Sequence, residues 1–204
     1  MIEVNKRLIL EKAEETQLIR QIVRDIITTY KIESDGTFYL PEDLSNEEEY
    51  ETEYTSDKSS VSVELTLVES DNVDDFIVNG FFIRKENVVE IKIIYNPNRK
   101  KEIIFDLIAE LNEVVAHEMR HLYQRDTEMY DLEVDDDREP YDHYSSPEEI
   151  DAQVYGFRRM KKITKRPFEQ LVRNWFKTHK SIHHLNSDQQ EEIIDMILDA
   201  NSKI

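Results

Sequence analysis

The sequence predicts an α+β fold, because two segments with helical periodicity flank a series of short segments with strand periodicity. Apolar residues recur at helical spacing over 8–30 and again over 100–125. Between these helices, apolar residues alternate with polar ones or form short runs that end at turn signals. The predicted strands, taken as antiparallel, cover residues 61–68, 76–84 and 88–95. They predict a small, mostly antiparallel sheet.

The chain of 204 residues, with 39% hydrophobic residues, is long enough to bury a sizeable core. We therefore expect one domain over 1–204. Within it, 1–98 forms the first helix and the sheet, 99–164 forms two central helices, and 165–204 is a helical extension.

The remaining segments carry loop or helix signals. The acidic, polar run at 42–60 indicates a solvated loop. Ser146 followed by Pro147 predicts a capped helix start, with the helix continuing to about 164. A further helix is predicted over 167–180, and a last one begins at a capping box over 187–190.

Charge and composition exclude several classes of function. The formal net charge is −19, from 45 acidic and 26 basic residues, so the average surface repels nucleic acids and anionic membranes. No 18 consecutive residues are apolar, and the first 30 residues contain no signal-peptide core. We expect a cytoplasmic protein that binds neither nucleic acid nor membrane. The sequence does not indicate an oligomeric state.

The run His117-Glu118-Met119-Arg120-His121 is an H-E-x-x-H motif within the helix predicted over 100–125. Two histidines four residues apart lie about 40° apart around a helix, so both rings can reach one metal ion. The chain has no cysteine, so a transition metal here must use histidine and carboxylate ligands. The motif therefore predicts His117 and His121 as ligands of Zn²⁺, with Glu118 beside them.

The order of elements around this motif resembles that of the gluzincin metallopeptidases, in particular the small minimal gluzincins of phages and mobile elements. In such proteins an irregular loop leads from the H-E-x-x-H helix to a second helix with an early glutamate, often as Glu-x-x-Ala. This chain reads Glu149-Ile150-Asp151-Ala152. The resemblance implies a zincin-like fold, and it implies Glu149 as the third zinc ligand. Glu148 and His143 remain alternative ligands.

The sequence departs from the family pattern one turn after Glu149. Gluzincins often have an acid there that accepts a hydrogen bond from a ligand histidine, whereas this chain has Gln153. Asp151 is an acid close by, but two residues along a helix point to nearly opposite faces. The sequence therefore does not identify the residue that accepts a hydrogen bond from a ligand histidine.

The resemblance implies a zinc metallopeptidase acting on a peptide or protein substrate. Zinc lowers the pKa of a bound water toward ~7, and Glu118 serves as general base. A second electrophile is expected from the connection that follows the motif helix, with His143 ranked before Tyr141 and Tyr144. An exposed loop histidine is the alternative interpretation of His143.

Two other functions remain open from the sequence. One is a gluzincin-like protein that uses zinc for structure or partner binding without hydrolysis, as Gln153 suggests. The other is an acidic interaction protein without a metal, as the net charge suggests. A second histidine group, His179, His183 and His184, has no glutamate after its first member and is expected to be structural or exposed.

Overall fold

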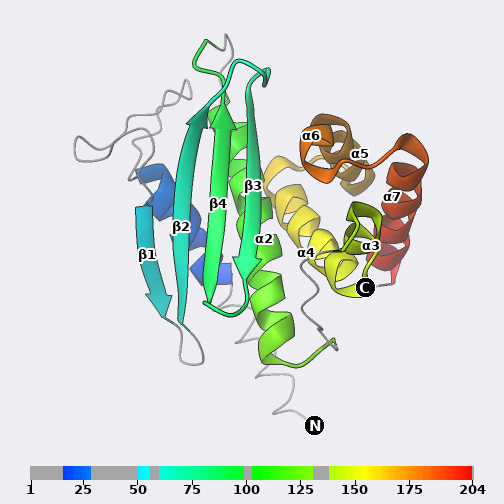
Figure 1. Ribbon diagram of the computed structural model, residues 1–204, viewed down its shortest axis with the longest axis horizontal. Helices are drawn as coiled ribbons and strands as arrows, with labels where there is room; N and C mark the ends of the chain where they lie inside the picture. The colour runs from blue at the N-terminus through cyan, green and yellow to red at the C-terminus, as the bar shows by residue number, and fades with distance from the viewer. Residues whose placement is uncertain (1–15, 29–49, 56–59, 99–102, 131–137, 204) are drawn as a thin grey trace. The chain divides into compact units, whose positions relative to one another are not determined.

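The computed structural model describes residues 16–28, 50–55, 60–98, 103–130 and 138–203. The α+β class is confirmed: a helix at 16–28 precedes a mixed sheet, and a long helix and a group of C-terminal helices follow it (Figure 1). The chain forms two compact units, Met1–Val115 and Ala116–Ile204. The rest of the first predicted helix, at 8–15 and 29–30, lies outside the described residues.

The first unit contains a four-stranded sheet in the order β1-β2-β4-β3. The strands are β1 (Tyr50–Thr55), β2 (Ser60–Glu69), β3 (Phe76–Ile83) and β4 (Val88–Tyr95). β1 pairs with β2, and β3 with β4, in antiparallel fashion, whereas β2 and β4 are parallel. The sheet is therefore mixed.

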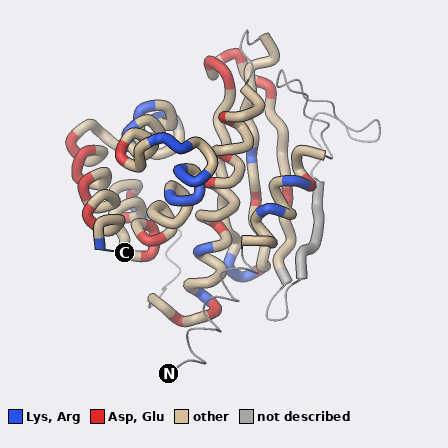
Figure 2. Tube along the Cα trace, turned by 180° about the vertical axis from the view of Figure 1, so that it is seen from behind, with Lys and Arg blue, Asp and Glu red and all other residues tan. Residues whose placement is uncertain are grey.

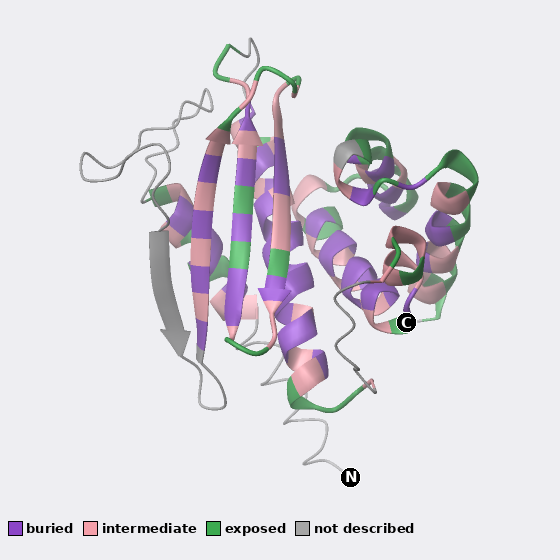
Figure 3. Ribbon diagram, in the orientation of Figure 1, coloured by how far each residue is buried: buried purple, intermediate pink, exposed green. Residues whose placement is uncertain are grey.

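The register places apolar side chains in rows across three strands. Val63 pairs with Val89, which pairs with Phe82, and Leu67 pairs with Ile93, which pairs with Val78. All six side chains are buried, while neighbouring positions on β4 such as Glu90 and Lys92 are exposed (Figure 3). Because side chains alternate between the faces of a strand, this pattern leaves one apolar face to be covered.

The predicted mostly antiparallel sheet is confirmed, since two of its three pairings are antiparallel, but the predicted loop is wrong and one pairing departs from the prediction. The loop predicted over 42–60 contains strand β1 at 50–55, and the rest of that segment lies outside the described residues except for Ser60, where β2 begins. The antiparallel arrangement fails for β2 and β4. Alternation of apolar residues shows which side chains share a face, but it does not fix the order in which strands pair.

Helices of the first unit supply buried apolar residues, and Figure 1 draws them behind the sheet. Ile19, Ile22 and Ile26 of the helix at 16–28 are buried. So are Leu107 and Leu111 in the first half of α2 (Ile104–Asp126), which was expected over 100–125. Their spacing of three or four residues produces the apolar stripe of an amphipathic helix.

The second unit begins with the last part of α2 and continues as a group of helices. These are α3 (Pro140–Tyr144), α4 (Pro147–Thr164), α5 (Phe168–Thr178), α6 (Lys180–His183) and α7 (Ser187–Ser202). The core between α4, α5 and α7 contains Phe157, Phe176 and Ile193, all almost fully buried. Phe157 contacts Trp175 edge to face, with ring centroids 6.3 Å apart.

At the N-termini of α4 and α7, the structure differs from the sequence prediction in two details. Ser146 is the N-cap residue of α4, but its hydroxyl donates to the carbonyl of His143 at 2.8 Å and caps no helix N–H. The capping box of α7 lies one residue earlier than expected. Asn186 accepts from the backbone of Asp188 and Gln189, and the Gln189 side chain accepts from the Asn186 N–H.

Charges are unevenly distributed over the helices (Figure 2). Acidic residues are spread along α7, while Lys161 and Lys162 occupy the last turn of α4, where positive charge offsets the helix dipole. In the described part of the chain, no helix has both the length and the apolar character that crossing a bilayer requires.

Candidate metal centre

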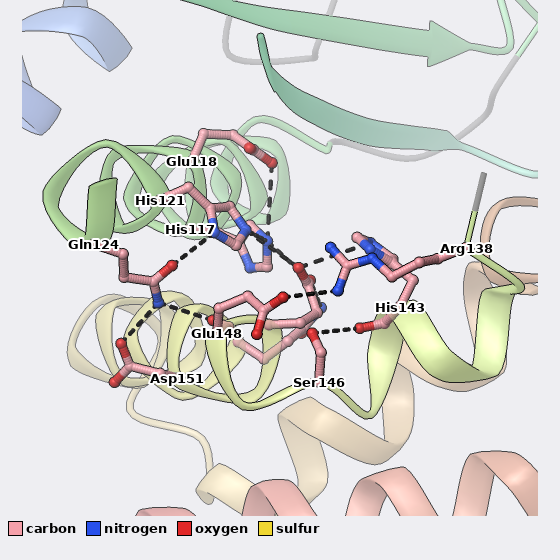
Figure 4. Close-up of polar contacts among 11 residues, drawn as sticks. His117, Glu118, His121, Gln124, Arg138, His143, Ser146, Glu148 and Asp151 are labelled. Atoms are coloured by element: carbon pink, nitrogen blue, oxygen red, sulfur yellow. Dashed lines mark hydrogen bonds and ion pairs between the residues drawn. The ribbon is translucent and has the colours of Figure 1, made fainter. Parts of the chain in front are cut away.

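The last part of α2 brings the three motif residues together in the second unit. His117, Glu118 and His121 are buried, and each offers a donor atom within 4.8 Å of the others. The two imidazoles come from adjacent turns, and their Nε2 atoms lie 3.1 Å apart (Figure 4). This confirms the expected His-Glu-x-x-His group as a cluster that can hold a metal ion.

Glu149, in the first turn of α4, lies against both histidines. Its Oε1 is 3.1 Å from Nε2 of His117, and its Oε2 is 3.2 Å from Nε2 of His121. Only 3% of Glu149 is exposed. Glu118 lies farther away, with Oε1 at 4.0 Å from His117 Nε2. The structure therefore brings two carboxylates to the histidines, and Glu149 is the closer one.

The neighbouring Glu148 points to a different partner. Its Oε1 accepts a hydrogen bond from Nη1 of Arg138 at 2.7 Å. Burial raises the pKa of Glu148, but the Arg138 guanidinium and the hydrogen bond from the Glu148 backbone N–H act together to hold the pKa below its ordinary value. Of the two candidate glutamates, Glu148 is thus engaged by Arg138 while Glu149 lies at the imidazoles.

The electrostatics of Glu149 favour its ionised form. Burial by itself raises the pKa of this carboxyl, but the adjacent His117 and His121 rings lower it well below the ordinary value. A buried carboxylate is stable only beside positive charge or strong hydrogen-bond donors. The cluster therefore combines the Glu149 carboxylate with the Nε2 atoms of His117 and His121. Such a set of donors requires a shared cation, which is either a proton or a metal ion.

The spacing of the donors also fits a metal ion. In a tetrahedral zinc site with bonds of about 2.0–2.2 Å, neighbouring donor atoms lie about 3.3 Å apart. The two imidazole Nε2 atoms lie 3.1 Å apart, and Glu149 presents Oε1 to His117 Nε2 at 3.1 Å and Oε2 to His121 Nε2 at 3.2 Å, so all three separations are close to this value. Nitrogen and oxygen donors suit several divalent transition metals, so the arrangement fits a metal without identifying it.

Helix α3 places His143 and Tyr144 near the cluster. His143 Nε2 lies 3.7 Å from Glu149 Oε2, and 41% of the His143 side chain is exposed. Burial lowers the pKa of His143 and outweighs the opposing effect of Glu149. Burial, together with Glu149 and Glu118, raises the pKa of Tyr144, so its hydroxyl keeps its proton.

Tyr141, the third candidate electrophile, is not brought to the cluster in the same way. A hydrogen bond to Glu192 of α7 is the main cause that raises the pKa of Tyr141. The Tyr141 hydroxyl is therefore hydrogen-bonded to a residue of α7. Of the three residues proposed from the sequence, His143 and Tyr144 lie near the Glu149 carboxylate.

Sequence reasoning missed the residue that supports His121. Gln124 is fully buried, and its Oε1 lies 2.9 Å from Nδ1 of His121 (Figure 4). Its Nε2 donates to the Glu148 carbonyl at 2.8 Å and to Asp151 Oδ2 at 2.9 Å. The sequence signal was the position three residues after His121, on the same helix face.

Gln153 has a different role from the one the family pattern suggested. Its Nε2 donates to Glu149 Oε1 at 3.3 Å, so it contacts the carboxylate. Among the described residues its Oε1 is buried without a hydrogen-bond partner. Gln153 thus orients Glu149, while Gln124 takes the position next to a histidine.

The second histidine group is mainly structural. His179 and His183 are buried, and His184 is exposed. His179 Nδ1 lies 3.1 Å from the Trp175 carbonyl, and His183 Nε2 lies 2.9 Å from the Phe176 carbonyl. Across the residues that the structure describes, the metal-binding group found is the one at His117, Glu118 and His121.

Comparisons of the chain with protein-family models, with curated proteins and with solved structures gave no match.

Proposed function

We propose that this chain is a zinc-dependent metallopeptidase of the gluzincin type, which hydrolyses peptide bonds of a peptide or protein substrate. The observation that carries the proposal is the close set of donors from His117, His121 and Glu149, with the Glu118 carboxylate beside it. In this proposal the first three residues hold Zn²⁺. Glu118 is left for proton transfer, and this division of roles is what hydrolysis at a zinc site requires.

When bound, Zn²⁺ in such a site supplies Lewis-acid chemistry, polarising a carbonyl and lowering the pKa of water to about 7. Glu118 accepts a proton from the water while the water oxygen forms a bond to the carbonyl carbon of the peptide. Glu118 then delivers this proton to the nitrogen as the C–N bond breaks, so a carboxylate and an amine are released. The burial of Glu118 favours this role because bulk water does not compete for its proton.

Two donors near the cluster are suited to stabilise negative charge on the carbonyl oxygen. Tyr144 retains its hydroxyl proton because burial and the charges of Glu149 and Glu118 raise its pKa, and its ring lies against that of His143, with centroids 4.9 Å apart. His143 is more exposed and lies on α3, where an incoming substrate can reach it. We assign His143 as the first catalytic donor and Tyr144 as the second.

A second function is favoured by one observation, the separation of 3.7 Å between His143 Nε2 and Glu149 Oε2. A small shift of α3 would make His143 a fourth donor. Four protein ligands close a zinc site to water and are typical of structural zinc. The protein would then bind zinc for stability or for partner recognition, without hydrolysis.

The Glu118→Gln protein tests the peptidase proposal. We expect zinc-loaded wild type to cut a defined mixture of unstructured peptides, with new termini identified by mass spectrometry. Removal of the general base should lower the cleavage rate by about 10²- to 10⁴-fold. Zinc content should stay at the wild-type value, because Glu118 is not one of the proposed ligands.

Glu169→Gln is the matched control, because Glu169 is exposed on α5 and pairs with Arg173. Its cleavage rate should equal that of wild type. Full activity of Glu118→Gln would contradict the proposed mechanism. Zinc-loaded wild type that cuts no peptide, with His143→Ala losing zinc, would instead favour the closed, structural site.

A further inference from the structure

The amide of Gln124 has only one orientation that satisfies its surroundings. Its NH₂ group faces two acceptors, the Glu148 carbonyl at 2.8 Å and Asp151 Oδ2 at 2.9 Å. A flipped amide would place its oxygen against both acceptors and lose both hydrogen bonds. Because Gln124 is fully buried, water cannot replace them. The amide oxygen must therefore face His121.

This orientation determines which nitrogen of His121 carries hydrogen. Gln124 Oε1 is an acceptor, and it lies 2.9 Å from His121 Nδ1, so Nδ1 must be the donor. The neutral ring then has its lone pair on Nε2. That atom faces His117 Nε2 at 3.1 Å and Glu149 Oε2 at 3.2 Å. The amide thus directs the His121 lone pair into the cluster.

Asp151 is itself held by a second residue of the motif helix. Arg120 donates from Nε to Asp151 Oδ2 at 2.7 Å and from Nη2 to Asp151 Oδ1 at 3.2 Å. The guanidinium also lies over the rings of Tyr123, at 4.7 Å, and Tyr155, at 5.5 Å. A bidentate pair between two planar groups fixes their orientation as well as their separation.

These contacts form one chain of hydrogen bonds from Arg120 through Asp151 and Gln124 to His121. Asp151 lies two residues after Glu149 and points away from the cluster along α4, yet Gln124 reaches across to it from α2 (Figure 4). The neutral amide separates the Asp151 charge from the imidazole. The ring of His121 is therefore oriented by an uncharged acceptor.

We propose that Gln124 and Asp151 are positioning residues for His121: Gln124 fixes the Nδ1–H tautomer, and Asp151 fixes Gln124. The proposal rests on the metal site of the proposed function, but not on catalysis. It predicts that the tautomer of His121 is set before any metal arrives, and that zinc affinity depends on two residues that touch no metal.

The first readout needs no metal. In the metal-free protein at pH 8, ¹⁵N spectra of the imidazoles should show neutral His121 as the Nδ1–H tautomer, with the signal assigned from a His121→Asn protein. Gln124→Met keeps the side-chain length but removes the acceptor, and it should release His121 to the Nε2–H tautomer. Asp151→Ala should give a mixture of tautomers, and Asp151→Asn should restore the wild-type spectrum by restoring the acceptor.

The second readout is the affinity for Zn²⁺ alone, measured by competition with a chromogenic chelator. Gln124→Met should weaken binding by about 10- to 100-fold, Asp151→Ala by less, and Asp151→Asn should recover most of the loss. Gln190→Met is the matched control, since Gln190, on α7, makes a comparable hydrogen bond to the Leu185 carbonyl. Its affinity should equal that of wild type.

Unchanged His121 tautomer and unchanged zinc affinity in both Gln124→Met and Asp151→Ala would overturn the proposal. If Gln124→Met fails to fold, the Asp151→Ala and Asp151→Asn pair decides it through loss and rescue of the tautomer. A wild-type protein that binds no Zn²⁺ would contradict the proposed function. The positioning roles would then be upheld or overturned by the tautomer alone.

Discussion

The second unit contains two histidine pairs with the same spacing and different surroundings. His117 and His121 are four residues apart and buried, and so are His179 and His183. In the first pair the two Nε2 atoms lie 3.1 Å apart, next to the Glu149 carboxylate. In the second pair, Nδ1 of His179 and both ring nitrogens of His183 meet backbone groups, and the rings meet aromatic side chains.

The hydrogen bonds of the second pair leave His183 no lone pair for a metal. His183 Nε2 donates to the Phe176 carbonyl, and its Nδ1 accepts from the backbone N–H of Leu185 at 3.0 Å. The ring of His179 stacks on Trp175, with centroids 4.7 Å apart and planes 9° apart. Two buried histidines four residues apart thus form a candidate metal site where a carboxylate converges on both rings.

The largest expected effect is on zinc affinity. His121→Ala removes a proposed ligand and should weaken Zn²⁺ binding by more than about 100-fold. His183→Ala removes a ring of the same kind from a site without a carboxylate, and it should leave the affinity within about threefold of wild type. Chelator competition on the folded variants checks both values. Equal losses of affinity in the two variants would contradict the claim that the first histidine pair, and not the second, belongs to the metal site.

A second effect concerns the pH dependence of stability. Burial lowers the pKa of His179 to about 4, against the opposing effect of the Trp175 carbonyl. The unfolded chain, with an ordinary histidine pKa near 6.5, binds more protons between these values. Stability is therefore lost as the pH falls from about 6.5 to about 4, by roughly 3 kcal/mol from this residue.

Urea unfolding of metal-free protein at pH 7 and pH 4.5 measures this contribution. His179→Gln should show a smaller loss of unfolding free energy between the two pH values than wild type does. His184→Gln, which changes an exposed histidine of the same group, should show the wild-type loss. An identical pH dependence in wild type and His179→Gln would contradict the assignment of His179 as a buried, neutral ring.

Local sequence patterns predicted the helices and the motif cluster but not the contacts that depend on other elements. The motif helix was expected over 100–125 and is observed as Ile104–Asp126. The spacing of His117 and His121 was sufficient to predict that both reach one point. The position of Gln124, three residues after His121, placed it on the same helix face, but its orientation could not be predicted because it depends on the Glu148 carbonyl and Asp151 of another helix.

The same distinction explains the errors in the fold. Strand β1 reads YETEYT, and its acidic residues resemble those of a solvated loop, whereas its pairing with β2 depends on the sheet. The parallel pairing of β2 with β4 is a property of chain topology that residue alternation does not encode. Ser146 has the residue type of a helix cap, but its hydroxyl meets the His143 carbonyl of the preceding turn.

The most direct test of the metal centre compares Glu149→Ala with Glu148→Ala, two adjacent glutamates of which only Glu149 lies at the histidines. Zinc content and affinity are measured for both variants beside wild type. We predict one tightly bound zinc in wild type, a loss of affinity of more than about 100-fold in Glu149→Ala, and a change within about threefold in Glu148→Ala. Wild-type zinc binding in Glu149→Ala, or a large loss confined to Glu148→Ala, would contradict the account.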